Sequence, residues 1–278
     1  MKVLSLVNMK GGVAKTTLAV NLADVLNRRE GKRVLLIDID PQFNATQCIM
    51  NGNSYKEYLS NKGYTVLDVF NDTPLSVVSS VNGTTTIPPK KIEEIIPYNI
   101  RNGFDLLPGA LELHRLEMGS GQGKEMRLRN YINHLRTNDL FDWVIIDTPP
   151  TPSAWMSAAL IASDYYLTPV RPEPLSATGI DLLRVVVNGI TSNYGLNLSC
   201  LGVVLTMAEE NTIVFSDAVD FIDNNTYWKG KRISKSLPKR TAIARGQGNQ
   251  SFILDLDDHD LNISMSRITK EVIERAEA

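Results

Sequence analysis

The chain has 278 residues, of which 43% are hydrophobic and 22% charged, a composition ordinary for a soluble globular protein. Its length supports one large α/β domain, and its net charge of -2 excludes a whole-molecule basic field that would attract nucleic acid. The two cysteines, Cys48 and Cys200, form no CxxC pair and suggest no disulfide framework. No apolar stretch reaches the ~18 residues that span a membrane, and nothing resembles a signal peptide. We therefore expect a cytoplasmic protein with no membrane partner.

Apolar strand-like runs alternate with helical patterns along the chain. The first strand, residues 3–8, leads into a glycine-rich turn, and the helix expected at 16–29 carries Leu18, Leu22 and Val25 on one face. The same pattern predicts strands at 34–39, 104–107, 143–147, 165–170 and 201–206, and helices at 124–136, 153–162, 176–192, 211–223 and 264–276. Strands that are apolar throughout and separated by helices indicate an α/β fold, with a mostly parallel twisted sheet and helices on both faces.

Residues 51–102 fit this alternation least well. They are rich in Asn, Ser, Thr, Gly and Pro, and they offer two short helical possibilities at 66–70 and 92–96. We expect this stretch to be a surface insertion in a single domain that spans residues 1–278.

A glycine-rich segment between the first strand and the first helix carries the clearest chemistry. Residues 8–17, NMKGGVAKTT, stand where a phosphate-binding loop is needed, because turn N–H groups and a helix N-terminus attract anionic oxygens. Lys15 would reach the β- and γ-phosphates, and the Thr16 hydroxyl would ligate Mg²⁺. The ordinary pattern GxxxxGK[ST] does not fit, since Met9 and Ala14 stand where it needs glycine. The deviant form KGGxxK[ST]T fits, with Lys10 as an additional lysine ahead of the glycine pair.

The stretch KGGVAKTT resembles the deviant Walker A loop of the ParA/MinD superfamily of P-loop NTPases. The resemblance implies ATP and Mg²⁺ as cofactors. It implies a nucleotide site made of Lys10, Gly11, Gly12, Val13, Ala14, Lys15, Thr16 and Thr17, with Met207 at the end of a later strand. In that family the lysine matching Lys10 reaches across a nucleotide-sandwich homodimer to the partner's phosphates. The family usually has glycine where Ala14 stands, and alanine is harmless there if its φ is negative.

Two further strand ends support a phosphate site. The second strand ends with Asp38 and Asp40, which are two residues apart and so project to the same side. This stretch resembles the family's switch I, by which Asp40 orients the attacking water and Asp38 supports the Mg²⁺ shell; the alternative is that one carboxylate caps the next helix. Residues 143–150 resemble a Walker B strand that opens switch II, where Asp147 would hold the metal through water. Parallel α/β sheets bind ligands at these carboxyl ends.

Other branches of the superfamily fit less well. A membrane-binding relative carries a basic amphipathic C-terminal helix, whereas the basic and acidic side chains of the expected helix at 264–276 are balanced. An iron–sulfur relative needs bridging cysteines, and Cys48 and Cys200 are too few. A tyrosine kinase relative would carry a C-terminal tyrosine cluster, which the sequence lacks.

A partition ATPase needs a surface that binds DNA without reading its sequence. Residues 224–254 contain no acidic side chain, and the seven basic residues toward their middle are Lys229, Lys231, Arg232, Lys235, Lys239, Arg240 and Arg245. We name this set the basic run. Lysine and arginine neutralise phosphates whatever the base sequence. The alternative is a solvated edge, balanced by the acidic residues of 255–260.

The resemblance therefore predicts a slow ATP hydrolase of the ParA type. Such a protein dimerises with ATP, binds nonspecific DNA on the nucleoid, and acts in plasmid or chromosome partition or cargo positioning. A ParB-like or other adaptor protein would stimulate hydrolysis. The second function class is an ATPase of the same fold that acts on a protein or metabolic assembly without DNA. Lys10 and the basic run favour the first class.

Overall fold

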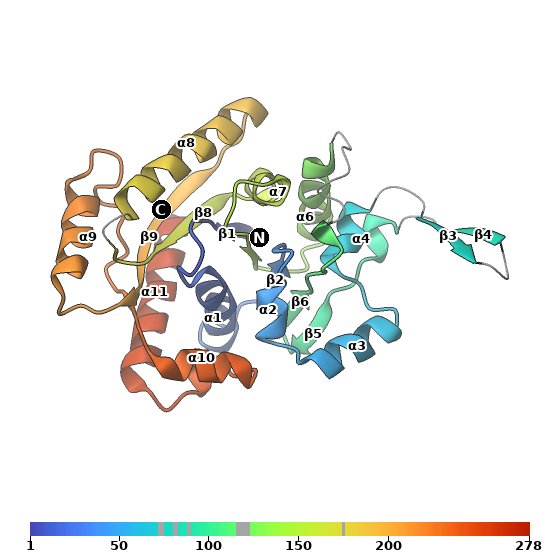
Figure 1. Ribbon diagram of the computed structural model, residues 1–278, viewed down its shortest axis with the longest axis horizontal. Helices are drawn as coiled ribbons and strands as arrows, with labels where there is room; N and C mark the ends of the chain where they lie inside the picture. The colour runs from blue at the N-terminus through green and yellow to red at the C-terminus, as the bar shows by residue number, and fades with distance from the viewer. Residues whose placement is uncertain (72–74, 80–82, 88–89, 115–122, 174–175) are drawn as a thin grey trace.

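The computed structural model describes residues 1–71, 75–79, 83–87, 90–114, 123–173 and 176–278, so parts of the expected insertion at 51–102 lie outside the described residues. Its centre is an eight-stranded sheet with the order β10-β9-β8-β1-β7-β2-β6-β5 (Figure 1). The strands are β1 (Lys2–Leu6), β2 (Val34–Asp38), β5 (Tyr98–Arg101), β6 (Phe104–Leu107), β7 (Trp143–Asp147), β8 (Tyr165–Val170), β9 (Ser199–Ala208) and β10 (Leu237–Pro238). Among these pairings only β5 with β6 is antiparallel.

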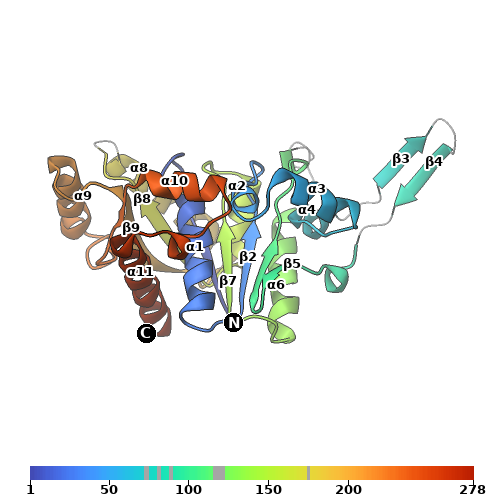
Figure 2. The ribbon, with the colours of Figure 1, turned by 90° about the horizontal axis from the view of Figure 1, so that it is seen from below.

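Helices cover both faces of the sheet (Figures 1 and 2). One face carries α1 (Lys15–Arg28) and α11 (His259–Glu277), and the other carries α6 (Arg127–Thr137), α7 (Ala154–Ala162) and α8 (Ser176–Tyr194), with α9 (Ile213–Asn224) packed beside α8. Neighbouring residues of a strand point to opposite faces. Leu36 of β2 therefore packs in the core with α1 and α11, while Leu35 and Ile37 pack with α6 and α7. Burial on both faces explains the uninterrupted apolar strands, and it confirms the predicted α/β fold.

The region 51–102 contains both expected helical segments and several elements that the sequence pattern did not predict. α4 (Val66–Phe70) and the short helix η1 (Ile92–Glu94) form at the helical possibilities 66–70 and 92–96, whereas the helix α3 (Gly52–Ser60) and the strands β3 (Leu75–Ser79) and β4 (Gly83–Ile87) were not predicted. β3 and β4 pair only with each other and extend away from the large sheet (Figure 2). The remaining short helices are α2 (Asn44–Gln47), η2 (Lys124–Met126), α10 (Thr241–Gly248) and η3 (Ile253–Asp255).

The last helix begins earlier than the apolar periodicity indicates. α11 starts at His259 rather than at 264, because Asp258 accepts a hydrogen bond from the Leu261 N–H at 3.0 Å and caps the first turn. Its apolar stripe of Met265, Ile268 and Val272 is fully buried against the body of the protein. Within the described ranges, none of the helices combines the length and hydrophobicity that a membrane span needs.

Candidate nucleotide site

Three parallel strands bring the predicted phosphate-site residues to one edge of the sheet. β1 and β2 flank β7, and the pairing places Leu6 and Asp38 both in register with Asp147. The loop after β1 and the carboxylates that end β2 and β7 therefore meet at the upper edge in Figure 2. Open α/β sheets bind ligands at this edge.

The loop between β1 and α1 holds two residues in the left-handed backbone region. Gly12 has a φ of 71°, and Ala14, the residue before α1, has a φ of 59° and a ψ of 33°. For a residue with a Cβ atom this conformation costs about 1–2 kcal/mol. The condition for a harmless alanine, a negative φ, is therefore not met. Thr206 of β9 helps to hold the loop, because its hydroxyl donates to the Val13 carbonyl at 2.9 Å.

Lys15 is the first residue of α1, directly after this loop, and is almost completely buried. Its Nζ donates to the backbone carbonyl oxygens of Asn8 at 3.0 Å and Lys10 at 3.4 Å. Burial lowers the pKa of Lys15, while the negative charges of Asp147 and Asp40 oppose that change. A poorly hydrated positive charge at a helix N-terminus is well placed to attract phosphate oxygens.

Thr16 and Asp147 form the part of the site that suits a cation. The Thr16 hydroxyl donates to Asp147 Oδ2 at 2.7 Å. The other carboxylate oxygen, Oδ1, is buried and has no hydrogen-bond partner among the described residues. Burial raises the pKa of Asp147, although its contacts with Thr16 and Lys15 oppose the change. A hydroxyl beside an unsatisfied carboxylate oxygen is a donor set that fits Mg²⁺.

Asp38 occupies a different position from the one that the sequence suggests. Its Oδ2 accepts hydrogen bonds from both the N–H and the hydroxyl of Thr46, at 2.7 and 2.8 Å. Thr46 lies in the first turn of α2, so Asp38 caps that helix, which matches the alternative left open above. Burial, together with the nearby Asp147 carboxylate, raises the pKa of Asp38. Asp38 is hydrogen-bonded to the first turn of the switch I helix. It is not among the residues that line the cavity next to switch I.

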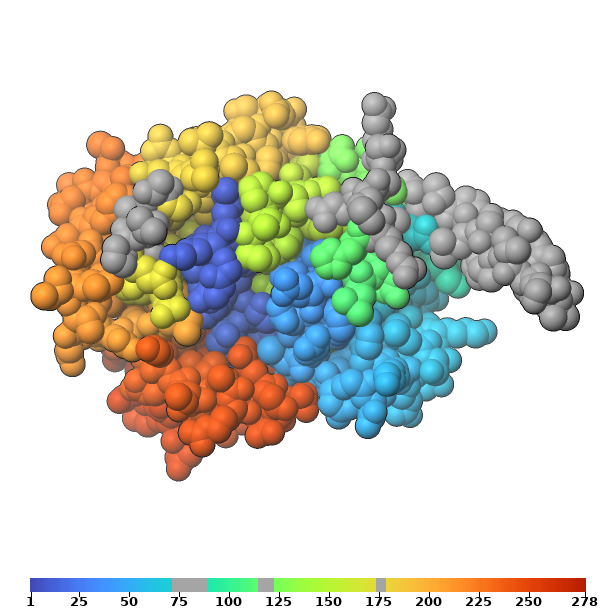
Figure 3. Space-filling view, in the orientation of Figure 1, coloured from blue at the N-terminus to red at the C-terminus, as the bar shows by residue number. Residues whose placement is uncertain are grey.

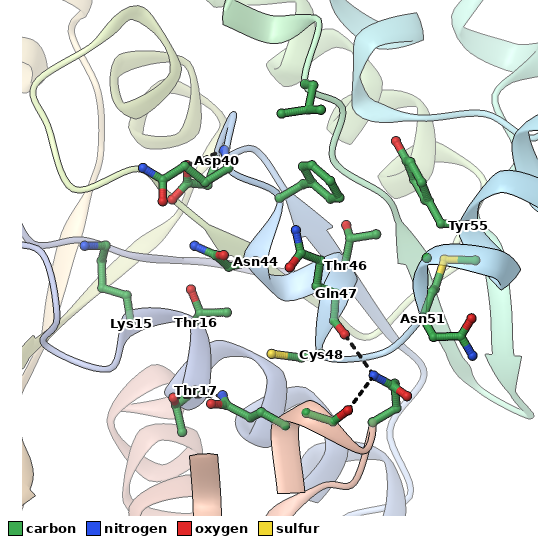
Figure 4. A pocket seen from close by; sticks show the side chains of 18 of the residues that line it. Lys15, Thr16, Thr17, Asp40, Asn44, Thr46, Gln47, Cys48, Asn51 and Tyr55 are labelled. Carbon is green, nitrogen blue, oxygen red and sulfur yellow. Dashed lines mark hydrogen bonds between the residues drawn. The ribbon is translucent and has the colours of Figure 1, made fainter. Parts of the chain in front are cut away.

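One cavity of about 1060 Å³ joins the loop to switch I. The cavity is lined by Gly11 through Thr17 on one side and by Asp40 on the other, and Figure 4 shows Lys15, Thr16 and Asp40 at the same end. Asp40 is also nearly buried, and its Oδ1 accepts from the Gln42 N–H at 2.9 Å. The structure thus brings the predicted lysine, hydroxyl and switch I carboxylate to one space.

The far end of α10 closes another side of this cavity. Gln247 donates from Nε2 to the Thr17 hydroxyl at 2.9 Å, and Gly248 and Gln250 also line the cavity. The space-filling view shows the loop, switch I and α10 next to one another on one face (Figure 3). Sequence reasoning missed these residues, because two glycines at 246 and 248 give only a weak signal for a helix end.

Besides Asp38 and Asp147, two further predicted residues, Met207 and Lys10, lie outside the cavity lining. Met207 has a φ of 49° at the end of β9 but does not line the cavity. The Lys10 side chain is also absent from that lining and instead forms an ion pair with Glu173, in the segment after β8.

The basic run follows β9 and does not form a single uniform face. The backbone of Lys231 and Ile233 hydrogen-bonds to Val203, whereas the Lys239 N–H donates to the carbonyl of Ala208. Val203 and Ala208 are five residues apart in β9, a distance of about 17 Å along the strand. The later members of the basic run therefore lie closer to the nucleotide edge than the earlier ones. Lys239, Arg240 and Arg245 are its members nearest that edge.

Ion pairs already engage part of the basic run. Arg232 pairs with Asp223 at 2.7 Å, Lys239 with Glu209 at 2.6 Å and Arg240 with Asp258 at 3.2 Å. Lys231 lies 3.4 Å from the centre of the Tyr227 ring. In the described part of the chain, Lys229, Lys235 and Arg245 form no ion pair with a carboxylate. Trp228 is fully buried and donates to Asp181, so it has no ring face free to stack on DNA bases.

The strand–loop–helix geometry, with Lys15 directly after the loop and Thr16 on Asp147, defines a P-loop NTPase. A family model described as an AAA domain matches residues 1–200. The sporulation initiation inhibitor protein Soj of Bacillus subtilis (strain 168) is 28% identical over 258 residues, which cover 92% of this chain and 91% of Soj. With the deviant loop and these matches, the chain belongs to the ParA/MinD-type P-loop partition ATPases.

Two solved structures share the fold. A plasmid partition protein of Borrelia burgdorferi B31 bound to AMPPNP matches with a TM-score of 0.73 at 21% identity, covering 99% of each chain. Cobyrinic acid a,c-diamide synthase of Mycobacterium smegmatis, with a bound ATP analogue and magnesium, matches with a TM-score of 0.73 at 20% identity, covering 100% of this chain and 96% of that chain. At these identities the likeness establishes the fold alone, which serves both a partition protein and a metabolic enzyme.

Proposed function

We propose that this chain is an ATP-driven dimerisation switch of the ParA type that binds DNA without sequence preference and positions a DNA molecule or other cargo. One observation carries the nucleotide part of the proposal. Lys15, Thr16 and Asp40 line one cavity, and Thr16 donates to Asp147, whose other carboxylate oxygen is buried and has no protein partner among the described residues. The structural neighbours that bind an ATP analogue support ATP as the ligand.

Each group in the cavity has a distinct task in the proposed ATP hydrolysis. The N–H groups from Gly11 to Thr17 bind the phosphates, and Lys15 neutralises charge on the β- and γ-phosphates. Thr16 and Asp147 would hold Mg²⁺, which supplies further charge neutralisation when bound. Asp40 orients the attacking water and accepts its proton. Asp38 acts indirectly, because it holds the switch I helix that follows Asp40.

Dimerisation and DNA binding belong to the same proposal. Lys10 stands ahead of the glycine pair and has a flexible side chain that would reach the phosphates of a second copy across the loop face.

Lys239, Arg240 and Arg245 lie at the nucleotide edge, on or next to α10, whose end contacts Thr17. A two-fold dimer would present two such sets to one duplex, which would place the protein on the nucleoid. An adaptor that completes the site would set the hydrolysis rate.

Nucleotide binding is tested by calorimetric titration of Mg-ATP. Lys15→Ala should abolish binding, because it removes the charge that faces the phosphates. Lys270→Ala is the matched control, since Lys270 is exposed on α11, is not among the residues that line the cavity, and should leave the affinity unchanged. Unchanged ATP affinity in a folded Lys15→Ala protein contradicts the site.

DNA binding is tested by fluorescence anisotropy with ATP, with ADP and without nucleotide. Wild type should bind only with ATP, and roughly six phosphate contacts per dimer would weaken binding about a thousandfold between 50 and 200 mM salt. The triple change of Lys239, Arg240 and Arg245 to Glu should remove DNA binding and leave ATP-dependent dimerisation intact. Arg129→Glu, at an exposed position of α6, is a charge-reversal control away from the basic run. If wild type binds no DNA in any nucleotide state, the second class, an ATPase acting on a protein or metabolic assembly, replaces this proposal.

A further inference from the structure

Lys10 is engaged within its own chain. Its ammonium contacts Glu173 Oε2, and the same carboxylate accepts from Arg171 Nε through its other oxygen at 3.0 Å. Lys10 and Glu173 are both partly exposed, at 41% and 29% of their side-chain surface. The Lys10 contact, with Arg171 close by, holds the pKa of Glu173 below its usual range. The lysine assigned to a second copy therefore has an intramolecular partner.

The start of the phosphate loop is built so that Lys10 lies beside Glu173. The Asn8 side-chain amide donates to the Pro169 carbonyl at the end of β8, at 2.7 Å. The Asn8 amide oxygen accepts from the Lys10 N–H at 2.9 Å. One buried side chain thus joins the loop to the strand that leads directly into the segment of Arg171 and Glu173.

Lys15 connects this arrangement to the nucleotide. Its Nζ donates to the Lys10 carbonyl and to the Asn8 carbonyl. An ammonium has only three donors, so contacts with both the β- and γ-phosphates would displace one of these two carbonyls, and the longer bond, to the Lys10 carbonyl at 3.4 Å, is the weaker one. Phosphate binding therefore withdraws a hydrogen bond from the backbone of Lys10 and loosens the residue that carries the ion pair.

We propose that Glu173 is a latch that holds Lys10 in its own protomer and so sets the ATP concentration at which two copies associate. The inference rests on the proposed function, in which the released Lys10 binds the phosphates of a second copy. A lysine ammonium engaged by Glu173 is not available to a second copy. Arg171 lowers the cost of release, because it continues to neutralise the Glu173 carboxylate after Lys10 departs.

Dimerisation is measured by light scattering as a function of ATP concentration, with Glu173→Gln against wild type. An exposed ion pair contributes up to about fivefold to an equilibrium. Two latches open per dimer, so the dimerisation constant of Glu173→Gln should rise by up to about 25-fold. Glu277→Gln is the matched control, since Glu277 forms an exposed ion pair with Lys2 at 3.4 Å and should not shift the curve. An unchanged or higher ATP requirement for Glu173→Gln overturns the latch.

A second measurement tests the latch without dimerisation. Nucleotide-free protein is treated with an amine-acetylating reagent, and the rate at Lys10 is followed by peptide mass spectrometry relative to exposed Lys229. Glu173→Gln should raise the relative Lys10 rate by up to about fivefold, and equal rates overturn the ion pair. If wild type does not dimerise with ATP, the proposed function fails, while this labelling result still decides whether Glu173 holds Lys10. If wild type dimerises and Glu173→Gln behaves identically, the latch fails and the proposed function stands.

Discussion

Asp38 and Asp147 end two adjacent parallel strands directly in register, and both carboxylates are fully buried. Their partners differ. One carboxylate oxygen of Asp38 accepts hydrogen bonds from Thr46 of switch I. One oxygen of Asp147 accepts from Thr16, and its other oxygen has no hydrogen-bond partner among the described residues. The register therefore places a fully hydrogen-bonded carboxylate oxygen of Asp38 beside a carboxylate with an unpaired oxygen, and the negative charge of Asp147 adds to the burial that raises the pKa of Asp38.

The first prediction concerns pH and Asp147 in nucleotide-free protein kept in EDTA. Burial raises the pKa of Asp147 to about 7, while an unfolded aspartate titrates near 3.9. The folded state therefore binds the proton more tightly, and this stabilisation is complete below about pH 4 and lost as the pH rises through about 7. Asp147→Asn removes that dependence. Urea unfolding should show wild type losing on the order of 2 kcal/mol more than Asp147→Asn between pH 5 and pH 8; parallel curves for the two proteins contradict this assignment.

The second prediction concerns Asp40 and the rate of hydrolysis. A side chain that orients water and accepts its proton acts in the transition state, with little effect on ground-state binding. Asp40→Asn should bind ATP with wild-type affinity and hydrolyse it about 100- to 1000-fold more slowly, as for a lost general base. Single-turnover phosphate release measures the rate, and Asp217→Asn on exposed α9 is the control. A rate within twofold of wild type would place the catalytic carboxylate elsewhere.

The third prediction concerns the strained Ala14. Glycine relieves about 1–2 kcal/mol of left-handed strain, and its greater freedom in the unfolded chain costs about 0.4–1 kcal/mol. The strain term wins, so Ala14→Gly should raise the free energy of unfolding by about 0.5–1 kcal/mol. Ala244→Gly, at an exposed position in α10, should do the opposite and cost up to about 1 kcal/mol. Denaturant titrations of both variants test this contrast, which fails if both changes destabilise equally.

The fourth prediction concerns the ion pair between Lys239 and Glu209, both of which are exposed. DNA phosphates must compete with Glu209 for the Lys239 ammonium. Glu209→Gln should therefore strengthen ATP-dependent DNA binding by about two- to fivefold at low salt, the range of an exposed pair. Glu277→Gln removes the same negative charge at the end of α11, at the opposite edge of the sheet from α10, which follows Lys239 (Figure 2), so it separates the local effect from net charge. Equal affinities of the two variants would show that Lys239 does not contact DNA.

The sequence by itself determined the fold class and the place of the phosphate loop. Apolar runs such as 34–38 and 143–147 predict buried parallel strands, because strands covered on both faces must be apolar at every position. The loop could be recognised because its glycines, Lys15 and Thr16 lie close together in the chain, in the order that phosphate binding requires. The same local information predicted Asp40 and Asp147 at strand ends, and the structure brings both to the loop.

Only the tertiary structure decided which partner each polar side chain takes. Lys10 meets Glu173 across 163 residues of sequence, and Gln247 meets Thr17 across 230. The partner of Asp38 was decided in the same way, since the fold of switch I brings the Thr46 N–H to it. The left-handed φ of Ala14 could not be predicted from the sequence either, because the surrounding structure imposes it against the residue's own preference. Local propensity fixes where strands and helices form, but hydrogen-bond partners depend on which elements pack side by side.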